Sequence, residues 1–463
     1  MPPSVFPTGT TIYYPEKCWN GYTLFQAELH RNRGYGAVLI DMNGNAVNRW
    51  KGLDGFPNKL LPGGHVMGST GVRNFKYGFQ DMLDLVEADW DGNIVWKFDK
   101  YELVKDPGRK PRWMARQHHD YQREGNPVGY YVPGMEFKPG GRTLILCHKN
   151  LQNPDISDKT LVDDTIIEVD KNGRIIWEWV CSEHFDEMGF DNRAKKTLRR
   201  NPGLNAAGGG PPKSAGDWMH ANSMSTLGPN RHDDSGDKLF HPDNIIWDGR
   251  QTNVIAIIDR KTGKIVWQLG PYFTAGKALR KIGQIIGQHH AHMVPRGLPG
   301  EGNILVFDNG GAAGYGAPNP SAPTGFDNAR RDFSRVLEID PVTLEIKWQY
   351  PPPAPGPGGN RLYSAFVSAA QRLPNGNTLI TEGNGGRIIE ITPEGEIVWE
   401  YISPYRHRML KITLVYRAYR YPYDWAPQEE RASEIPVPRI DNSKFRVPGS
   451  PRTKREKVTA VKG

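Results

Sequence analysis

A repeated hairpin pattern is the feature that most constrains the fold of this 463-residue chain. In each copy an apolar run leads to Asp or Pro, then to a tight turn that usually contains Gly, and then to a short apolar stretch with Trp. Two alternating strands around an Asn-Gly, Asp-Gly or Thr-Gly turn are typical of a β-hairpin. Leu344 takes the place of the turn glycine in the fifth copy. The six copies end at Trp50, Trp96, Trp177, Trp267, Trp348 and Trp399.

A second hairpin follows several copies, most clearly at residues 297–310 and 372–383, so that one unit holds about four strands. Repeated four-stranded units bury their faces against one another when they close into a ring. We therefore predict an all-β, six-bladed β-propeller that forms a single domain over residues 10–426. Residues 409–422 would complete the last blade or close the ring, and one short helix is expected at 275–286. Residues 1–9 would be an N-terminal extension, and 427–463 a Pro/Lys/Arg-rich tail that is disordered.

Composition and charge narrow the choice of partners. The net charge of +8 comes mostly from residues 444–463, which hold seven Lys or Arg and one Glu. The rest of the chain is close to neutral, so we expect no nucleic-acid partner. No stretch approaches the roughly 18 apolar residues of a membrane span, so no membrane partner is expected. The first twenty residues lack a basic start followed by an apolar run, which predicts a cytoplasmic protein.

Histidines recur at one place in the repeat. In three units a histidine follows the repeat tryptophan: His119 and His290 stand 23 residues after theirs, and His220 stands 43 residues after its own. Ser368 occupies the corresponding place in a fourth unit, 20 residues after Trp348. Equivalent strands of a closed ring present equivalent positions to its axis. We therefore expect the three histidines to converge on the axial channel as catalytic residues.

Imidazole at such a place can act as an acid or base, as a nucleophile, or as a metal ligand, and the residues alone leave these roles open. A divalent metal, if present, would be held by His119, His220 and His290. Strand alternation predicts that His118 and His289 face away from the channel, whereas His292 shares the face of His290. The other histidines are interpreted as surface or structural residues: His30, His65, His148, His184, His232, His241 and His407.

Other side chains near these segments suit a small-molecule substrate. Tyr121 and Trp218 would contact a planar or phenolic ligand, although propellers also use aromatic residues for packing. Arg372 would hold an anion, although surface ion pairing explains it equally well. With His292 and Ser368, these residues form the predicted substrate-binding set.

Several segments together resemble the bacterial arylsulfotransferases, a family of six-bladed propellers. They are TGTTIYYPEKCWNGYTLF (from Thr8), DWMHANSM (from Asp217), GQHHAHMVPRGLPGEGNILVFDNGG (from Gly287) and AQRLPNGNTLITEG (from Ala370). The resemblance implies transfer of a sulfuryl group from an aryl sulfate to a phenol through a transiently sulfated histidine, with no cofactor. His220 and His290 match two channel histidines of the family, while Ser368 stands where the sulfated histidine is expected. By the same resemblance, a member with a secretion signal would be periplasmic.

Three other hypotheses remain. A serine without a nearby base cannot replace imidazole as a nucleophile, so His119 or His290 would take the covalent role, or the channel would serve a metal-dependent hydrolase or lyase. A non-catalytic binding propeller is also compatible with the repeat. The stretch DRKTGKIVW (from Asp259) resembles the docking motif of quinoprotein dehydrogenases, but the repeat count is six, whereas that family has eight blades.

Overall fold

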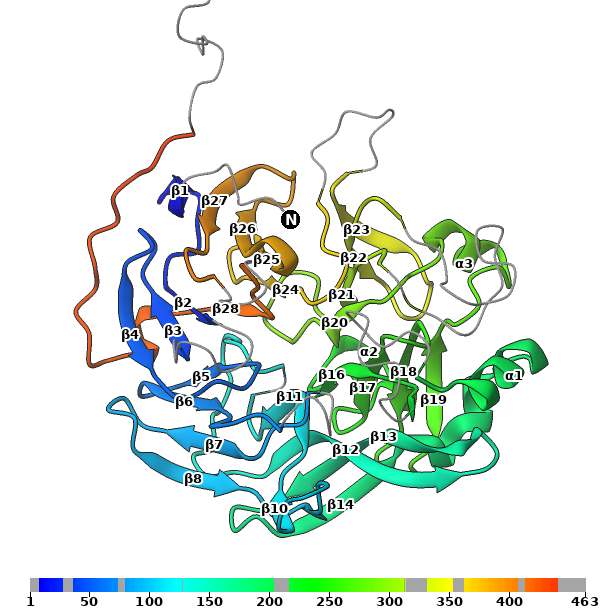
Figure 1. The fold of residues 1–463 in the computed structure, drawn as a ribbon. Helices are drawn as coiled ribbons and strands as arrows, with labels where there is room; N and C mark the ends of the chain where they lie inside the picture. Colours follow the sequence, from blue (N-terminus) through cyan, green and yellow to red (C-terminus); the bar gives the residue numbers. More distant parts are fainter. Residues whose placement is uncertain are drawn as a thin grey trace, which may run out of the picture.

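The computed structural model describes residues 8–27, 36–73, 80–126, 128–203, 216–311, 313, 331–352, 362–406 and 413–439. Six antiparallel sheets stand around a common axis, as Figure 1 shows, which confirms the predicted all-β, six-bladed, single-domain propeller. Residues 1–7 and the part of the predicted tail at 440–463 lie outside the described residues.

The first three blades each contain four antiparallel strands. Each blade is described from its innermost to its outermost strand. Blade 1 contains β28 (Ala418–Tyr421), β2 (Tyr22–Gln26), β3 (Ala37–Ile40) and β4 (Ala46–Trp50), and blade 2 contains β5 (Lys59–Leu61), β6 (His65–Gly68), β7 (Leu85–Ala88) and β8 (Ile94–Phe98). Blade 3 contains β11 (Gln117–Arg123), β12 (Thr143–Asn153), β13 (Ser157–Val169) and β14 (Ile175–Val180). A separate hairpin pairs β9 (Glu102–Val104) with β10 (Arg112–Met114).

The other three blades follow the same order. Blade 4 contains β16 (Ala221–Thr226), β17 (Ile245–Gly249), β18 (Val254–Ile258) and β19 (Ile265–Leu269). Blade 5 contains β20 (His289–Met293), β21 (Ile304–Asp308), β22 (Arg335–Ile339) and β23 (Ile346–Tyr350). Blade 6 contains β24 (Ala369–Arg372), β25 (Thr378–Glu382), β26 (Arg387–Ile391) and β27 (Ile397–Ile402), with β1 (Gly9–Tyr13) as an added outer strand. The short strand β15 (Gly216–Asp217) runs parallel to β13.

The two ends of the chain close the ring. The C-terminal strand β28 is the innermost strand of blade 1 and pairs with β2, with Tyr22 opposite Tyr421. The N-terminal strand β1 pairs with β27 of blade 6. Of the two roles considered for residues 409–422, closing the ring is therefore the correct one. Strands from both ends of the sequence hold the first and last blades together.

The repeat tryptophans join neighbouring blades. The indole Nε1–H of Trp50 donates to Asp89 O at 2.9 Å, which lies in the hairpin turn of the next blade. Trp267 and Trp348 repeat this contact in later blades. Trp399 completes the circle by donating to Met42 O at 2.7 Å. Because these tryptophans tie their own blades to the next, the repeat that predicts the blades also explains how most of the ring is held.

Blade 3 departs from the pattern. The contact to the next blade comes from Trp179, whose Nε1–H donates to Gly263 O at 2.8 Å. Trp177, the residue that the repeat indicates, lies with its ring 4.1 Å from the guanidinium of Arg260 instead. Strand alternation puts residues 177 and 179 on the same face of β14, which is why either can be aligned with the repeat.

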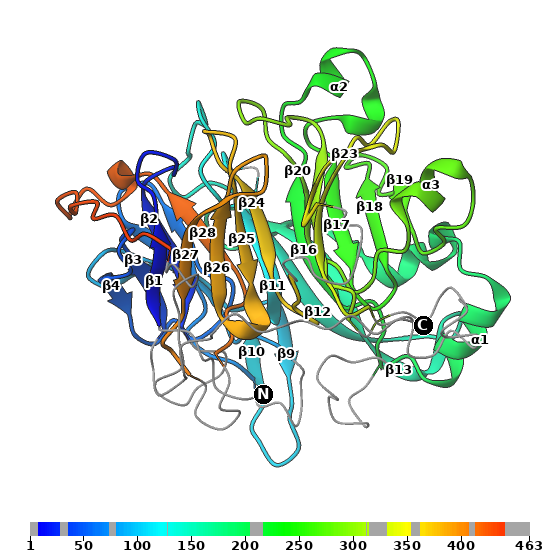
Figure 2. The same cartoon turned by 90° about the horizontal axis from the view of Figure 1, so that it is seen from above.

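Helices are few and lie outside the blades. The predicted helix at 275–286 is confirmed as the shorter α3 (Lys277–Ile282). The α1 helix (Asn192–Arg200) begins where the Asp191 carboxylate accepts hydrogen bonds from the backbone N–H groups of Arg193 and Ala194. Both α1 and α2 (Arg231–Asp234) interrupt the repeat, which therefore could not predict them. Figure 2 shows α2 at one end of the ring and the β9–β10 hairpin at the other. Among the described residues, no helix is both long and apolar enough to cross a bilayer.

Candidate active site

An unusual backbone conformation places the three predicted catalytic histidines. His119, His220 and His290 have φ values of 55°, 54° and 56°, in the left-handed region that residues other than glycine rarely adopt. The pairing register with the neighbouring strand shifts across His119 and His290, and just after His220, between Ala221 and Ser223. In blade 6 the same conformation occurs at Val367, with φ of 57°, one residue before Ser368. Such strain persists only where the surrounding structure imposes it, and it is concentrated at functional sites.

The same bend corrects one expectation from the sequence. Regular alternation would send His118 and His119 to opposite faces, but their Nδ1 atoms lie 2.8 Å apart. The left-handed residue interrupts the alternation, so that neighbouring side chains meet. Regular alternation, the reason for predicting that His118 faces away from the channel, therefore does not hold at this bend, and the orientation of His118 relative to the channel stays a prediction.

His119 and His220 form a close pair. Their ring centroids are 4.6 Å apart and the planes meet at 70°. Nδ1–H of His220 donates to Oδ2 of Asp217 at 2.6 Å. All three residues are buried. Because Asp217 lies in β15, which is paired to the long strand β13, the carboxylate that orients His220 is held by blade 3.

Burial and charge set the protonation of this pair. Burial and the nearby His220 lower the pKa of His119 well below its usual value, so His119 is neutral at physiological pH. Burial by itself would raise the pKa of Asp217. The interaction with His220 lowers that pKa by more, so the carboxyl group of Asp217 is ionised. Burial lowers the pKa of Arg250 to about 10, against the opposing effect of Asp217, and leaves Arg250 positively charged. The pair therefore lies close to one carboxylate and one buried cation.

His290 belongs to a second group. Its Nε2 lies 3.2 Å from the hydroxyl of Tyr419, and its ring centroid is 4.4 Å from that of His292. Nε2 of His292 lies in turn 2.9 Å from the hydroxyl of Tyr130. The three predicted catalytic residues are thus placed in two groups, His119 with His220 and His290 with His292.

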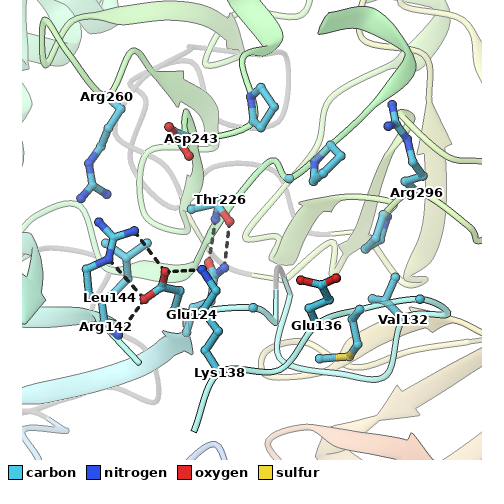
Figure 3. Close-up of a pocket in the computed structure, with 18 of the residues that line it drawn as sticks. Glu124, Val132, Glu136, Lys138, Arg142, Leu144, Thr226, Asp243, Arg260 and Arg296 are labelled. Carbon is cyan, nitrogen blue, oxygen red and sulfur yellow. Dashed lines mark hydrogen bonds and ion pairs between the residues drawn. The ribbon is translucent and has the colours of Figure 1, made fainter. Parts of the chain in front are cut away.

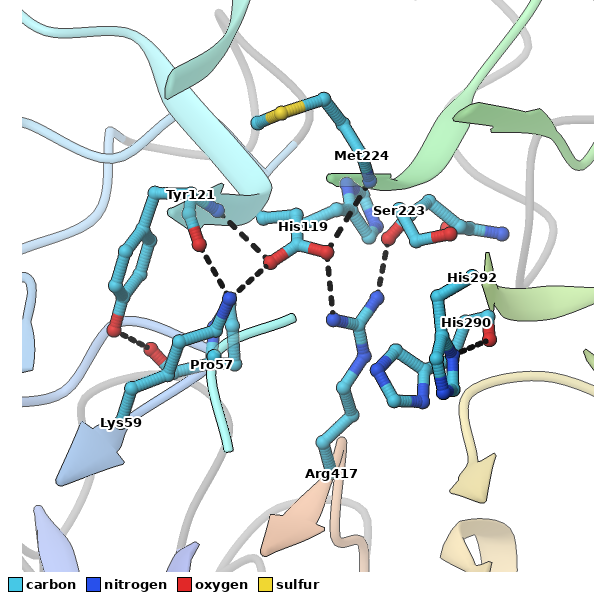
Figure 4. Close-up of polar contacts among 12 residues, drawn as sticks. Pro57, Lys59, His119, Tyr121, Ser223, Met224, His290, His292 and Arg417 are labelled. Atoms are coloured by element: carbon cyan, nitrogen blue, oxygen red, sulfur yellow. Dashed lines mark hydrogen bonds and ion pairs between the residues drawn. The ribbon is translucent and has the colours of Figure 1, made fainter. Parts of the chain in front are cut away.

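A buried ion network lies between blades. Nζ of Lys59 is 2.6 Å from Oδ1 of Asp120, and Nη1 of Arg417 is 2.9 Å from Oδ2 of the same carboxylate (Figure 4). Nη2 of Arg417 also donates to Asn222 O at 2.5 Å. Blades 1, 2, 3 and 4 each contribute one of these residues. Burial by itself would lower the pKa of Arg417. The attraction to Asp120 has the larger effect and raises that pKa, so Arg417 stays positively charged.

The predicted substrate-binding residues mainly contact the protein itself. The hydroxyl of Tyr121 lies 2.8 Å from Pro57 O, Nε1–H of Trp218 donates to Asp163 Oδ1 at 2.7 Å, and Nη2 of Arg372 lies 2.5 Å from Glu338 Oε2. The hydroxyl of Ser368 accepts a hydrogen bond from Gly383 N at 3.1 Å, and no described histidine or carboxylate bonds to it. A role for these residues and for His292 in substrate binding stays a prediction.

A cavity of about 640 Å³ lies away from the paired histidines. Thr226 lines it near the end of β16 (Figure 3), and Gln122 lines it near the end of β11. His119 and His220 lie near the beginnings of those two strands. Several of its charged side chains are paired: Glu124 with Lys138 and Arg142, and Arg260 with Glu168. Because acidic and basic residues both line the cavity, its charge does not point to one class of ligand.

Several site residues were missed from the sequence. Asp217 stands three residues before His220, so the local spacing could have indicated it. Arg417 could not be found in this way, because its place depends on β28 being the innermost strand of blade 1. His148, interpreted as surface or structural, is fully buried and stacks on His118 at 3.6 Å between ring centroids. His30 and His407 lie outside the described residues.

The group that best fits a metal ion also differs from the prediction. In the described part of the chain, the atoms of His118, His148 and Asp164 lie within 4.8 Å of one another, as the ligands of one ion would. No such set is found there for His119, His220 and His290.

The fold and the site define a six-bladed propeller with histidines gathered where its innermost strands begin. A family description, Arylsulfotransferase (ASST), matches residues 134–397, which is more than half of the chain. The chain belongs to the arylsulfotransferase family. This confirms the family to which the sequence motifs pointed.

Other comparisons are weak. No curated protein sequence matches the chain. A Bacteroides caccae protein of unknown function is 12% identical, with 86% of this chain and 98% of that one covered and a TM-score of 0.42. A streptogramin B lyase is 13% identical, with 86% and 84% covered and a TM-score of 0.35. A Staphylococcus aureus virginiamycin B lyase is 10% identical, with 86% and 89% covered and a TM-score of 0.34. These similarities support no inference about function.

Proposed function

We propose that the protein transfers a sulfuryl group from an aryl sulfate to a phenol, with His220 as the nucleophile. The observation that carries this proposal is the 2.6 Å hydrogen bond from His220 to Asp217, next to the neutral ring of His119. Membership of the arylsulfotransferase family supports the class of reaction. The choice of His220 rests on the geometry alone.

The hydrogen bond selects the reacting nitrogen. Because Nδ1 of His220 is engaged with Asp217, Nε2 is the ring nitrogen that can offer a lone pair to a substrate. In the first step Nε2 attacks sulfur, an S–N bond forms, and the S–O bond to the aryl group breaks with its electron pair on the leaving phenolate. In the second step the oxygen of an acceptor phenol attacks sulfur and the S–N bond breaks. The proton lost by the acceptor balances the proton taken up by the released phenolate.

Nearby cations favour an anionic substrate. Arg250 is positively charged and its charge acts on both Asp217 and His289. The sulfuryl group keeps negative charge on its oxygens throughout transfer, and a cation in a buried site stabilises that charge more than one in water does. We assign Arg250 to sulfate recognition for this reason.

Access to the pair requires a rearrangement. His119 and His220 are 2% and 1% exposed, so an aryl sulfate reaches them only after this part of the axis opens. Exclusion of water after closure would protect a sulfated histidine from hydrolysis.

The test uses the full chain with 4-nitrophenyl sulfate as donor and phenol as acceptor. The wild type should release nitrophenol and form phenyl sulfate, and donor alone should add the mass of one sulfuryl group to the peptide that contains His220. His220→Ala should abolish both signals. His241→Gln, which changes a partly exposed histidine, should retain them. Transfer by His220→Ala, or labelling of another histidine in the wild type, would overturn the assignment of the nucleophile.

A further inference from the structure

Behind the paired histidines lies a second cluster, formed by three adjacent strands of blade 3. Nε2 of His118 on β11 is 3.1 Å from Oδ1 of Asp164 on β13. Nε2 of His148, on the intervening strand β12, is 3.8 Å from the same oxygen. His148 and Asp164 are directly opposite in the register of β12 and β13. The regular sheet therefore holds two of the three side chains side by side, and the bend at His119 brings in the third.

The polar atoms of this cluster lack well-directed hydrogen bonds. His118 and His148 are 0% exposed and Asp164 is 2% exposed. Nε2 of each histidine and both carboxylate oxygens of Asp164 are buried without a well-directed hydrogen bond, although His118 Nε2 approaches Asp164 Oδ1 to 3.1 Å. An unsatisfied buried polar group destabilises the folded protein, and more so if it is charged. Four such atoms facing one small volume point to a ligand that satisfies them together.

The spacing of the atoms fits a metal ion. Ligands at about 2.0–2.1 Å from a tetrahedral ion stand about 3.3 Å from one another. The two measured separations, 3.1 and 3.8 Å, lie on either side of this value. The rings of His118 and His148 are stacked with only 15° between their planes. Two imidazole nitrogens with one carboxylate are a donor set that suits Zn²⁺ and its first-row neighbours, whereas Mg²⁺ and Ca²⁺ prefer oxygen ligands alone.

The surrounding residues orient the ligands. Nδ1–H of His148 donates to Oδ1 of Asp81 at 2.6 Å. Oδ2 of Asp81 is held by Arg73 at 2.8 Å and by Arg116 at 2.9 Å. A histidine that binds a metal through one ring nitrogen usually donates the other N–H to a carboxylate in this way. Nε2 is therefore the ring nitrogen of His148 that faces the cluster.

We propose that His118, His148 and Asp164 bind one divalent first-row transition-metal ion, with Zn²⁺ as the probe. The site lies beside the proposed nucleophile and does not depend on its role. A bound ion would occupy Nε2 of His118, so the proton of that ring would stay on Nδ1 and be donated to Nδ1 of His119. Through this contact the ion would fix the tautomer of His119.

The test is metal analysis of the full chain purified from zinc-supplemented cells and dialysed against metal-free buffer. The wild type should retain about one zinc per chain, and chelation should lower its melting temperature. Cobalt in place of zinc should give the visible absorption of an ion bound by nitrogen and oxygen ligands. Asp164→Asn, which keeps the shape of the side chain, should lose the zinc, and its melting temperature should not respond to chelator. His241→Gln should behave as the wild type.

Two results would overturn the proposal. One is zinc content in the wild type no higher than in Asp164→Asn, because binding would then occur elsewhere on the chain. The other is an unchanged melting temperature when zinc is added to or removed from the wild type, with no cobalt spectrum. If His118→Gln or His148→Gln fails to fold, the cobalt spectrum of the wild type still decides the question.

Discussion

Oδ2 of Asp217 lies 2.6 Å from Nδ1 of His220, and both residues are buried where blade 3 meets blade 4. This contact fixes which nitrogen of His220 carries the proton. It also joins an orienting carboxylate on one blade to the proposed nucleophile at the start of the next. A propeller can thus build a reactive histidine from two blades, neither of which holds the pair alone.

The first prediction concerns this contact. Asp217→Asn keeps the size of the side chain but removes the charge that holds the Nδ1–H tautomer of His220. We expect kcat for sulfuryl transfer to fall by about 10²- to 10⁴-fold with a smaller change in KM. Steady-state kinetics with 4-nitrophenyl sulfate measures both. Asp233→Asn, outside the site, is the matched control, and an unchanged kcat in Asp217→Asn would argue against His220 as nucleophile.

The second prediction joins the proposed metal to the proposed reaction and rests on both. With the ion bound, His119 would carry its proton on Nε2 and could donate a hydrogen bond to a sulfuryl oxygen. Without the ion, His118 can donate from Nε2 to Asp164, and His119 then presents a lone pair on Nε2 instead. Removal of zinc should therefore lower kcat in the wild type but not in Asp164→Asn. Equal activity with and without zinc would refute the coupling and leave the binding site itself standing.

How far the sequence predicts the fold can be judged from the tryptophans. Trp50, Trp267, Trp348 and Trp399 each end a predicted hairpin and each bond to the turn of the following blade. The repeat carries this information because every blade needs the same contact. Where the chain offers two tryptophans on one face, as in β14, the repeat cannot tell which one makes the contact.

The third prediction separates those two tryptophans. Trp179→Phe removes the donor to Gly263 O and leaves that carbonyl without its bond, whereas Trp177→Phe loses a contact with Arg260 on the surface. We expect Trp179→Phe to lower the free energy of unfolding by about 1–3 kcal/mol. Trp177→Phe should change it by less than about 1 kcal/mol. Thermal unfolding of the two variants provides the comparison, and an equal effect would contradict the docking role of Trp179.

The site was harder to predict than the fold. The recurring segments correctly indicate His119 and His220 as neighbours, because they depend on the repeat. The contact between His118 and His119 was not expected, because the left-handed residue at His119 is not visible in a period-two pattern. Asp164 and His148 are 16 positions apart and meet only through the register of two long strands. Contacts of that kind depend on the folded sheet and have no local signature in the sequence.

The fourth prediction tests the central ion network. Arg417→Gln would leave Asp120 with Lys59 as its one ion-pair partner among the described residues. Loss of one partner of a buried ion pair typically costs about 3–5 kcal/mol, and Lys59 should keep the cost near the lower value. Lys347→Gln, which removes an exposed ion pair with Glu345, should leave the stability almost unchanged. Melting temperatures of the two variants measure the difference, and similar values would show that Arg417 does not support the ring.

The last prediction concerns Asp248, a buried residue of β17. Its Oδ2 accepts hydrogen bonds from Ser223 Oγ at 2.6 Å and from Ala291 N at 2.9 Å. Burial outweighs these bonds and raises the pKa of Asp248 from 3.8 to about 7. The folded protein therefore binds this proton more tightly than the unfolded chain does. The contribution of this group to stability is complete below pH 3.8 and is lost as the pH rises to about 7, by about 1.4 kcal/mol per pH unit.

The Asp248→Asn variant has no proton to lose at this position. We therefore expect its melting temperature to rise relative to that of the wild type as the pH increases from about 5 to about 8. Scanning calorimetry of both proteins across this range measures that difference, and a value that does not change with pH would show that Asp248 titrates normally.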